Sequence, residues 1–240
     1  MKKRLFLFPF YQWIVVFPIL LILTILVALA TILLSPVFPN TRLSYFPARL
    51  WARVACKFCF VHVKVVGLEN LNPHQSYVLA LNHQSLFDIF VVYGWMPCFF
   101  KWMIKAEVHR IPFVGQACDA AGHIFINRSN PVSARLSLEK AKARLQNGVS
   151  LAIFPEGTRT YSGQMGKFKR GAFRIATDLS LPIVPISLKG GFDRLPRNTL
   201  NVTPGLIEMI IHKPIDLNFE HPENGSDLIQ QTWDIIHSSL

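Results

Sequence analysis

The sequence predicts an α/β fold with a largely parallel central sheet flanked by helices, preceded by an N-terminal membrane-embedded helical segment. Two patterns predict this fold. Short apolar runs alternate with stretches of helical periodicity along most of the chain, and a long uncharged apolar segment lies near the N-terminus. A chain of 240 residues can build one domain with a sizeable core and is hardly long enough for two.

The N-terminal segment is expected to remain in the membrane. Residues 5–41 contain no Asp, Glu, Lys or Arg, and residues 14–34 are almost wholly apolar. About 20 helical residues cross the roughly 30 Å hydrocarbon core of a bilayer. The basic residues at 2–4 resemble the start of a signal peptide, but the apolar run is too long for one. We therefore expect a membrane anchor over residues 1–41, as one long or two short helices, and an α/β domain over residues 42–240.

The prolines of this region suggest where the anchor bends and ends. Pro18 allows either a clean span or a short helix followed by a longer one that dips into one leaflet. Positive charges flank both sides of the segment, so the charge rule leaves the topology open. Pro36, Pro39 and Pro47 predict an irregular connector that leads out of the membrane.

The remaining chain alternates between strands and helices. Short apolar runs predict strands at residues 61–66, 77–81, 98–104, 123–126, 150–154, 183–188 and 206–211. Helical patterns cover residues 85–93, 131–146 and 169–179, and Gly225-Ser226 opens a final amphipathic helix. In a parallel sheet, ligands bind where the strands end at their carboxyl side. The motifs that follow all lie at predicted strand ends.

The first motif places a histidine near a carboxylate. Strand 77–81 runs directly into His83, and Asp88 follows five residues later. On a regular helix these side chains would point about 140° apart. They meet only if His83 lies in the turn before the helix and Asp88 in its first turn, with Ser85 as N-cap. A carboxylate on one ring nitrogen then fixes the tautomer, so the other nitrogen can accept a proton from a hydroxyl. Alternatively, Ser85 and Asp88 form only a capping box. Neither His83 nor Asp88 is expected in the core.

The second motif follows strand 150–154 and consists of a proline, an acid, a glycine and an arginine. Arg159 can bind a phosphate through two parallel hydrogen bonds, Thr158 can donate another, and Gly157 lets a substrate approach the backbone. Alternatively, Arg159 and Glu156 pair within a tight turn. The positive charge next to this motif, which also fits a solvated helix face, comes from Lys167, Lys169, Arg170 and Arg174.

The charge balance narrows the range of partners. The formal net charge is +11, which suits an anionic lipid surface or an acidic protein. The sequence contains neither zinc-finger spacing nor a long Lys/Arg block, so nucleic acid is not an expected partner. Cys56 and Cys59 have the spacing of half a zinc site, but no second pair follows them, and we expect buried free thiols.

Taken together, the motifs resemble the glycerophospholipid acyltransferase family, and in particular its bacterial 1-acyl-glycerol-3-phosphate acyltransferases. Residues 82–88 resemble the NHxxxxD block of that family, and residues 154–159 match its FPEGTR block. The other matching blocks lie at residues 105–107 with 111–115, 122–128 and 184–186. The blocks occur in the family's order over roughly residues 61–188.

The resemblance implies a role for each matched residue. His83 is implied to be the general base that deprotonates the acceptor hydroxyl, and Asp88 to orient it and compensate its charge. The implied binding residues for the glycerol phosphate are Glu156, Gly157, Thr158 and Arg159, with Lys105 and Arg128 as further candidates. Gly157 is also the candidate backbone donor for a tetrahedral oxyanion.

The implied substrates are lysophosphatidate and a fatty acyl thioester of acyl carrier protein or coenzyme A. The hydroxyl attacks the thioester directly, so the reaction requires no acyl-enzyme, cofactor or metal. The implied location is the cytoplasmic (inner) membrane, with the catalytic domain facing the cytoplasm and an anionic membrane surface. The acceptor remains open between lysophosphatidate, glycerol 3-phosphate and a lyso-aminolipid. Two alternatives belong to other functional classes. The protein could be a metal-dependent membrane hydrolase with His83 and Asp88 as metal ligands, or a membrane adaptor without catalytic activity.

Overall fold

The structure is a computed structural model that describes residues 2–127, 144–145, 147–217 and 225–240. The predicted helix over residues 131–146 falls outside the described residues, apart from 144 and 145. Arg128, one of the candidate phosphate ligands, also lies outside them.

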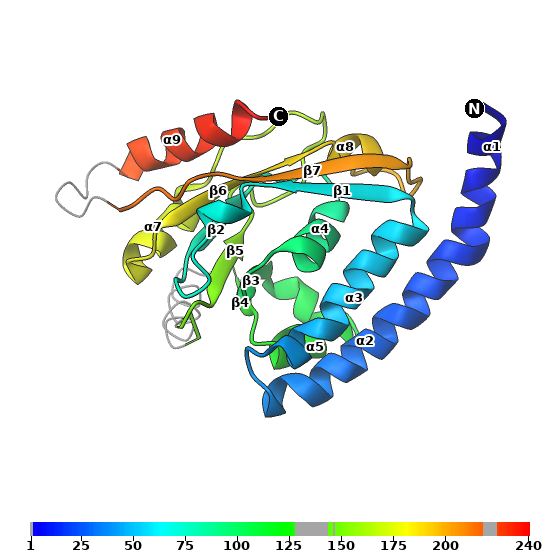
Figure 1. Cartoon of the computed structure of the whole chain (residues 1–240), viewed down its shortest axis with the longest axis horizontal. Coiled ribbons are helices and arrows are strands. Elements are labelled where there is room, and N and C mark those ends of the chain that lie inside the picture. The colour runs from blue at the N-terminus through cyan, green and yellow to red at the C-terminus, as the bar shows by residue number, and fades with distance from the viewer. Residues whose placement is uncertain (1, 128–143, 146, 218–224) are drawn as a thin grey trace.

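A mixed sheet forms the centre of the molecule (Figure 1). Within the described residues it has seven strands in the order β1-β7-β6-β2-β5-β3-β4. The strands are β1 (Val61–Val66), β2 (Val78–Leu81), β3 (Phe100–Lys105), β4 (Ile124–Ile126), β5 (Ser150–Ile153), β6 (Ile183–Lys189) and β7 (Gly205–Ile211). Neighbouring strands are parallel except β6 and β7, which are antiparallel. The predicted α/β class is confirmed, and each strand begins and ends within two residues of its predicted position.

Helices cover both faces of this sheet. They are α3 (Arg42–Phe58), α4 (Phe87–Trp95), α5 (Val114–Ala120), α7 (Arg170–Leu179), α8 (Gly191–Arg194) and α9 (Gly225–His237). Strand β2 is buried along its whole length, as an apolar run without alternation predicts. Leu79 and Leu81 pack on the side of α3 and α4, whereas Val78 and Ala80 pack on the side of α7 and α9. The carboxyl end of β2 therefore emerges between two helical layers.

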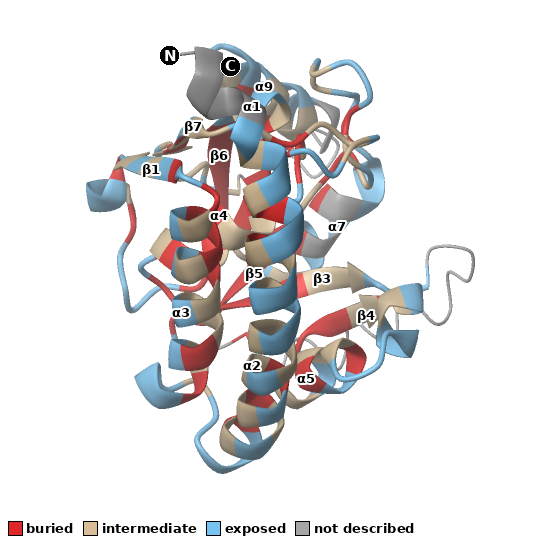
Figure 2. Cartoon of the chain, turned by 90° about the vertical axis from the view of Figure 1, so that its right-hand side faces the viewer, coloured by how far each residue is buried: buried red, intermediate tan, exposed pale blue. Residues whose placement is uncertain are grey.

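The N-terminal region forms one continuous helical rod of α1 (Lys2–Tyr11), a π-helical turn (Gln12–Val16) and α2 (Phe17–Val37). Residues Leu7–Val37 are long enough and apolar enough to cross a membrane, with a mean hydropathy of 2.9. Pro18 does not break the rod, because it occupies the first turn of α2, where a missing N–H costs little. Most of α2 is exposed along its outer side (Figure 2).

The predicted proline connector is reduced to residues 38–41 around Pro39, because Pro36 lies inside α2 and Pro47 inside α3. A capping box starts α3: Thr41 Oγ1 accepts from the N–H of Ser44, and Ser44 Oγ accepts from the N–H of Thr41. These two reciprocal bonds satisfy N–H groups that a helix start leaves unpaired. Pro47 lies buried inside α3 without ending it, so the chain turns through residues 38–41 from α2 into a second long helix.

The N-terminal rod is also bonded to the far end of the sheet. The buried side chain of Gln12 donates a hydrogen bond to the carbonyl of Leu200 and accepts one, 2.8 Å long, from the N–H of Val202. Further along the rod, Thr24 of α2 accepts a hydrogen bond at its Oγ1 atom from the indole N–H of Trp51 in α3, at 2.9 Å. Helix α2 therefore packs as a wall of the fold through polar contacts as well as apolar ones.

Candidate active site

The two sequence motifs meet at the carboxyl ends of β2 and β5, which are adjacent parallel strands. Ala80 of β2 pairs with Ile153 of β5, so the residues three positions after this pair in each chain segment lie at the same level. These residues are His83 and Glu156, and the backbone N–H of His83 donates to Glu156 Oε1 at 2.7 Å. The sheet register thus joins residues 73 positions apart in the chain.

His83 and Asp88 form the pair that the spacing predicts. His83 lies in the turn after β2, and Asp88 lies in the first turn of α4. The distance from His83 Nδ1 to Asp88 Oδ2 is 2.8 Å. The imidazole stacks on Phe154 with 3.8 Å between ring centroids, which fixes its plane. The other ring nitrogen of His83 has no hydrogen-bond partner among the described residues, and the side chain lines a large cavity.

One oxygen of Asp88 also holds the turn. Besides His83, Asp88 Oδ2 accepts the N–H groups of Gln84 at 2.7 Å and Ser85 at 2.8 Å. The predicted N-cap is wrong by one residue, because Leu86 occupies the N-cap position. Asp88 therefore combines both roles considered from the sequence: it stabilises the start of the helix, and it orients the histidine.

Asp88 is fully buried, in contrast to the expectation that it lies outside the core. Its second oxygen, Oδ1, has no hydrogen-bond partner in the part of the chain that the structure describes. A Cβ atom built on Gly191, the first residue of α8, would lie 2.8 Å from this oxygen. Gly191 therefore lets the backbone after β6 close over the carboxylate. The sequence analysis missed this residue, although two consecutive glycines directly after a strand were the available signal.

Asn82, the first residue of the NHxxxxD block, joins β2 to β6. Its Nδ2 donates to the carbonyl of Leu188 at 2.9 Å, and its Oδ1 accepts from the N–H of Leu188 at 2.7 Å. Asn82 is completely buried, so this reciprocal pair is shielded from water. The pair fixes the end of β2 immediately before the histidine.

Glu156 does not face the cavity, in contrast to the expectation that it contacts the substrate. One carboxylate oxygen accepts the N–H of His83, and the other accepts the N–H of Gly166 at 2.8 Å. These bonds also replace the pair with Arg159 that the sequence allowed. Burial raises the pKa of Glu156, although the hydrogen bonds from Gly166 and His83 oppose this shift. In the structure the carboxylate of Glu156 therefore connects the loop after β2 with the loop after β5 through hydrogen bonds to their backbones.

Gly157 makes the turn from which the next two side chains emerge. Its φ of +76° is one that L side chains rarely adopt, and its N–H donates to the carbonyl of Phe154 at 2.9 Å. Because this N–H is already engaged, the structure does not favour Gly157 as the oxyanion donor. Thr158 and Arg159 line the cavity. The Arg159 side chain has no hydrogen bond or ion pair with any described residue, and burial followed by the nearby Arg197 lowers its pKa.

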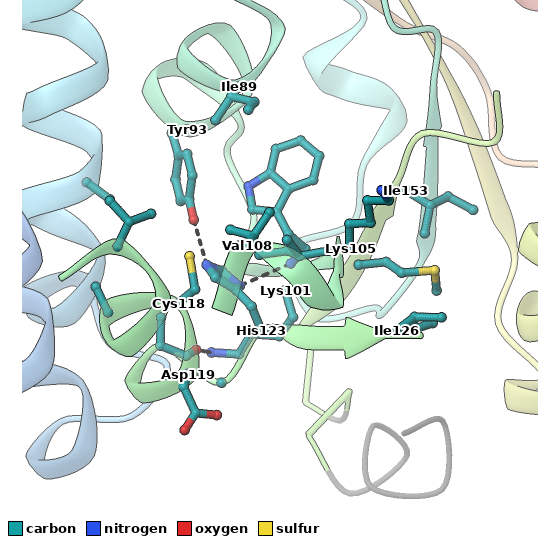
Figure 3. Close-up of a pocket in the computed structure, with 18 of the residues that line it drawn as sticks. Ile89, Tyr93, Lys101, Lys105, Val108, Cys118, Asp119, His123, Ile126 and Ile153 are labelled. Carbon is teal, nitrogen blue, oxygen red and sulfur yellow. Dashed lines mark hydrogen bonds between the residues drawn. The ribbon is translucent and has the colours of Figure 1, made fainter. Parts of the chain in front are cut away.

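The cavity has a volume of about 1800 Å³ and extends from His83 between the sheet and helices α2, α3 and α5. Figure 3 shows part of its wall, where Tyr93 and His123 point toward each other and their Oη and Nε2 atoms lie 2.6 Å apart. The N–H of Trp102 donates to His123 Nδ1 at 3.1 Å. Nδ1 is therefore the acceptor, and the proton is on Nε2. Burial lowers the pKa of His123 to about 3, so this histidine is neutral near pH 7.

Two cations of the cavity wall have different surroundings. Lys101 is buried, and its Nζ donates to the carbonyl of Ala121 at 2.6 Å. Burial lowers the pKa of Lys101 to about 8. Lys105, a predicted phosphate ligand, is mostly exposed and lies 3.1 Å from a carboxylate oxygen of Glu107. The structure thus brings Lys105 to the cavity with a carboxylate already beside it.

The described residues include no group of three or more His, Cys, Asp or Glu side chains placed to hold a metal ion. Cys56 and Cys59 are buried free thiols, as expected for a pair that no second ligand pair follows in the sequence. Burial raises the pKa of each to about 12, so both remain protonated thiols near neutral pH.

A family model described as Acyltransferase matches residues 62–189, a segment that includes the His83–Asp88 pair and the second motif. The chain belongs to the acyltransferase family. The chain is 32% identical over 203 residues to a 1-acyl-sn-glycerol-3-phosphate acyltransferase from Pseudomonas aeruginosa, covering 82% of this chain and 78% of that protein.

A plant protein of the same name is also similar to this chain. A chloroplastic 1-acyl-sn-glycerol-3-phosphate acyltransferase from Arabidopsis thaliana is 35% identical over 173 residues. That alignment covers 71% of this chain and 48% of the plant protein, so the chain spans about half the length of this relative. Among solved structures, the 1-acyl-sn-glycerophosphate acyltransferase PlsC from Thermotoga maritima superposes with a TM-score of 0.72 at 25% identity, covering 92% of this chain and 95% of PlsC.

Proposed function

We propose that this protein is a membrane-associated 1-acylglycerol-3-phosphate acyltransferase. It transfers a fatty acyl group from a thioester to the sn-2 hydroxyl of lysophosphatidate and so forms phosphatidate. The observation that carries the proposal is the His83–Asp88 pair, which opens onto a large cavity next to Arg159. The names of the relatives from bacteria, plants and animals support this choice of acceptor.

The proposed reaction is a direct displacement at the thioester carbonyl. His83 accepts the hydroxyl proton on the ring nitrogen that faces away from Asp88. The acceptor oxygen then bonds to the acyl carbon, the carbon–sulfur bond breaks, and the proton passes from the imidazolium to the leaving thiolate. Asp88 holds the tautomer and stabilises the imidazolium through the 2.8 Å contact to Nδ1. The step forms no acyl-enzyme and uses no cofactor.

The residues of the second motif divide between positioning and binding. Glu156 fixes the backbone of His83, and Gly157 provides the turn. Thr158 and Arg159 face the cavity, where Arg159 binds the acceptor's phosphate and Lys105 adds positive charge. A dianionic acceptor fits this basic rim better than a neutral monoacylglycerol does.

The anchor and the substrates together suggest where the enzyme works. The acceptor is a membrane lipid, and acyl thioesters of carrier protein or coenzyme A are soluble in the cytosol. We therefore place residues 1–41 in the cytoplasmic membrane and the domain over residues 42–240 at its cytoplasmic face. The net charge of +11 favours both the anionic lipid surface and an acidic carrier protein.

The proposal is tested with the purified full-length protein in detergent. A labelled acyl thioester is offered with lysophosphatidate, glycerol 3-phosphate, a lyso-aminolipid and a monoacylglycerol, each with and without EDTA. We expect fastest transfer to lysophosphatidate and no effect of EDTA. Faster transfer to another acceptor would reassign the substrate. Loss of activity in EDTA would favour the metal-dependent alternative, and no transfer to any acceptor would refute the enzyme assignment.

A further inference from the structure

Arg197 is a cavity residue that lies outside the segment matched by the family model. It belongs to the loop between α8 and β7, whereas the family match ends at residue 189. Its side chain nevertheless lines the same cavity as His83 and Arg159. The sequence analysis did not single it out, because no motif surrounds it.

The structure holds the guanidinium of Arg197 against the second motif. Its NH1 group donates to Thr158 Oγ1 at 2.7 Å and to the backbone carbonyl of Arg159 at 2.8 Å. The guanidinium carbon also lies 4.0 Å from the ring centroid of Tyr161, in the geometry of a cation–π contact. These three contacts use one nitrogen and one face of the group. They fix its position and leave its other N–H groups without a partner among the described residues.

Two arginines therefore meet at the cavity without an ion-pair partner among the described residues, although the charge of Asp88 partly opposes the effect of Arg197 on the pKa of Arg159. No Asp or Glu oxygen of the described residues lies within 4.0 Å of Arg159 or Arg197, although the protein forms such pairs elsewhere, as between Lys64 and Glu208. The positive charge of Arg197 is, after burial, the main reason why the pKa of Arg159 is lowered. Like charges held together are stabilised by an anion that binds both.

We propose that Arg159 and Arg197 form a two-arginine site that binds the phosphate monoester of the acceptor lipid. The inference rests on the proposed function and adds to it a residue from outside the family motifs. A phosphate monoester carries about −1.5 to −2 charges near pH 7 and has three acceptor oxygens. It matches two guanidinium groups better than the singly charged phosphodiester that links the pantetheine arm to acyl carrier protein does. Thr158 and Tyr161 hold Arg197 in place for this contact.

The test compares Arg197→Ala and Arg197→Lys with wild type on two acceptors, lysophosphatidate and monoacylglycerol. Each acceptor is paired with acyl-coenzyme A and with an acyl-N-acetylcysteamine thioester, which has no phosphate. We expect Arg197→Ala to reduce the preference for the phosphorylated acceptor about 10- to 100-fold, mainly through KM and with both donors, as loss of a charge-assisted pair predicts. Arg197→Lys should recover only part of the preference, because an ammonium lacks the planar fork.

A control variant in the same loop separates charge from structure. Arg194 also donates to a loop carbonyl, that of Pro204 at 2.6 Å, but it does not line the cavity. Arg194→Ala should therefore keep the acceptor preference, whatever it does to the melting temperature. Equal losses on both acceptors in Arg197→Ala would overturn the proposal in favour of a purely structural role. A loss seen only with acyl-coenzyme A would assign the site to the donor's phosphate and would also overturn it.

Binding of inorganic phosphate tests the site independently of turnover. We expect millimolar phosphate to raise the melting temperature of wild type and of Arg194→Ala, and to have a much smaller effect on Arg159→Ala and Arg197→Ala. An equal rise in all four proteins would refute the two-arginine site. If wild type shows this pattern but transfers no acyl group to lysophosphatidate, the proposed function fails while the anion site stands.

Discussion

The carboxyl ends of β2 and β5 lie side by side, yet they are built in different ways. After β2, Asp88 Oδ2 accepts three hydrogen bonds, and the backbone of His83 is held by Glu156. After β5, Gly157 makes a turn, and the side chain of Arg159 then enters the cavity without a hydrogen bond to any described residue. The end of β2, with His83 and Asp88, is held by hydrogen bonds within the protein, and we call it the locked half of the site. The end of β5, with Thr158 and Arg159, presents side-chain donors to the cavity, and we call it the open half.

This difference matches what each end must do in the proposed reaction. Proton transfer needs a histidine whose tautomer and position are fixed before the substrate arrives. Substrate binding needs donors whose partners arrive with the substrate, because bonds already made within the protein contribute nothing to affinity. Substitution of the residues that hold the locked half in place, such as Asp88, should therefore affect both turnover and stability. Substitutions of the groups that act on the substrate, His83 and Arg159, should affect turnover alone.

The largest effect should come from His83→Ala. Loss of the general base should lower kcat about 10³- to 10⁴-fold, because general acid–base catalysis typically contributes this much. Asp88 keeps its two backbone donors in this variant, so the melting temperature should change little. A steady-state assay together with a thermal melt checks both points. A variant that retains a tenth of the wild-type rate would disprove the assignment of the base.

Asp88→Asn should show the coupling expected of the locked half. The amide cannot stabilise an imidazolium as a carboxylate does, and kcat should fall about 10²-fold or more. Because Asp88 is fully buried and holds the start of α4, this variant should also melt at a lower temperature than wild type. Measurement of kcat and melting temperature on the same preparation decides the matter. A large loss of turnover at unchanged stability would show that the turn is held by other contacts.

Arg159→Ala is the corresponding variant of the open half. It should cost about 2–4 kcal/mol in kcat/KM on lysophosphatidate, as expected for losing a charge-assisted pair to phosphate. Arg159→Lys should also be impaired, because the ammonium cannot form the two parallel hydrogen bonds. The melting temperature should stay close to that of wild type. A clear drop in stability, with equal losses on a neutral acceptor, would mean that Arg159 supports the loop.

Gly191→Ala tests whether the locked half depends on close packing over Asp88. The added Cβ would lie 2.8 Å from Asp88 Oδ1, a contact that requires the carboxylate or α8 to shift. We expect roughly a tenfold loss in kcat with little change in KM, as a misplaced catalytic group predicts. Gly94→Ala, in α4 of the locked half, is a matched control, because a Cβ there makes only ordinary contacts, the nearest at 3.4 Å, and Gly94 does not line the cavity. Equal kinetics of the two variants would refute this role for Gly191.

The smallest effect concerns Glu156 and pH. Burial raises the pKa of this carboxyl in the folded protein, so the folded state keeps the proton to a higher pH than the unfolded chain does. The stabilising effect of the proton is complete below the unfolded pKa of about 4.3 and is lost as pH rises through the folded pKa. Glu156→Gln does not titrate. This variant should melt at a lower temperature than wild type, because one backbone N–H loses its acceptor. The stability of wild type falls as its Glu156 loses the proton, so the two melting temperatures should approach each other between about pH 4 and pH 7. A difference in melting temperature that grows with pH would contradict the raised pKa of Glu156.

Much of the fold follows from local sequence patterns. Buried parallel strands are short apolar runs, and such runs placed all seven strands of the described sheet within two residues. Helix α3 was missed because Pro47 suggested an irregular segment, while the reciprocal cap of Thr41 and Ser44 depends on backbone geometry. A capping pair of this kind is a weak signal beside a proline, which predicts the end of a helix.

The candidate site divides in the same way. His83 and Asp88 are close in sequence, so their meeting in one turn follows from spacing alone. The contacts of Glu156 with His83, and of Arg197 with Thr158, join residues 73 and 39 positions apart and depend on strand order and loop paths. Motif spacing carries no information on those paths. The motifs therefore identified Glu156, but as a substrate contact, whereas the structure places its carboxylate between the backbones of His83 and Gly166. No motif identified Arg197.

The contact of Gln12 with Leu200 and Val202 has a consequence for how the chain matures. Residues 12 and 202 are separated by 190 positions, so the ribosome completes most of the protein before this contact can form. With the N-terminal rod inserted into the bilayer, as we propose, the last strand must be brought back to a helix already held at the membrane. Because residues of α2 also line the cavity, the cavity is complete only after the rod has docked on the finished domain. With the rod in the bilayer, the completed cavity would open beside the membrane that holds the acceptor.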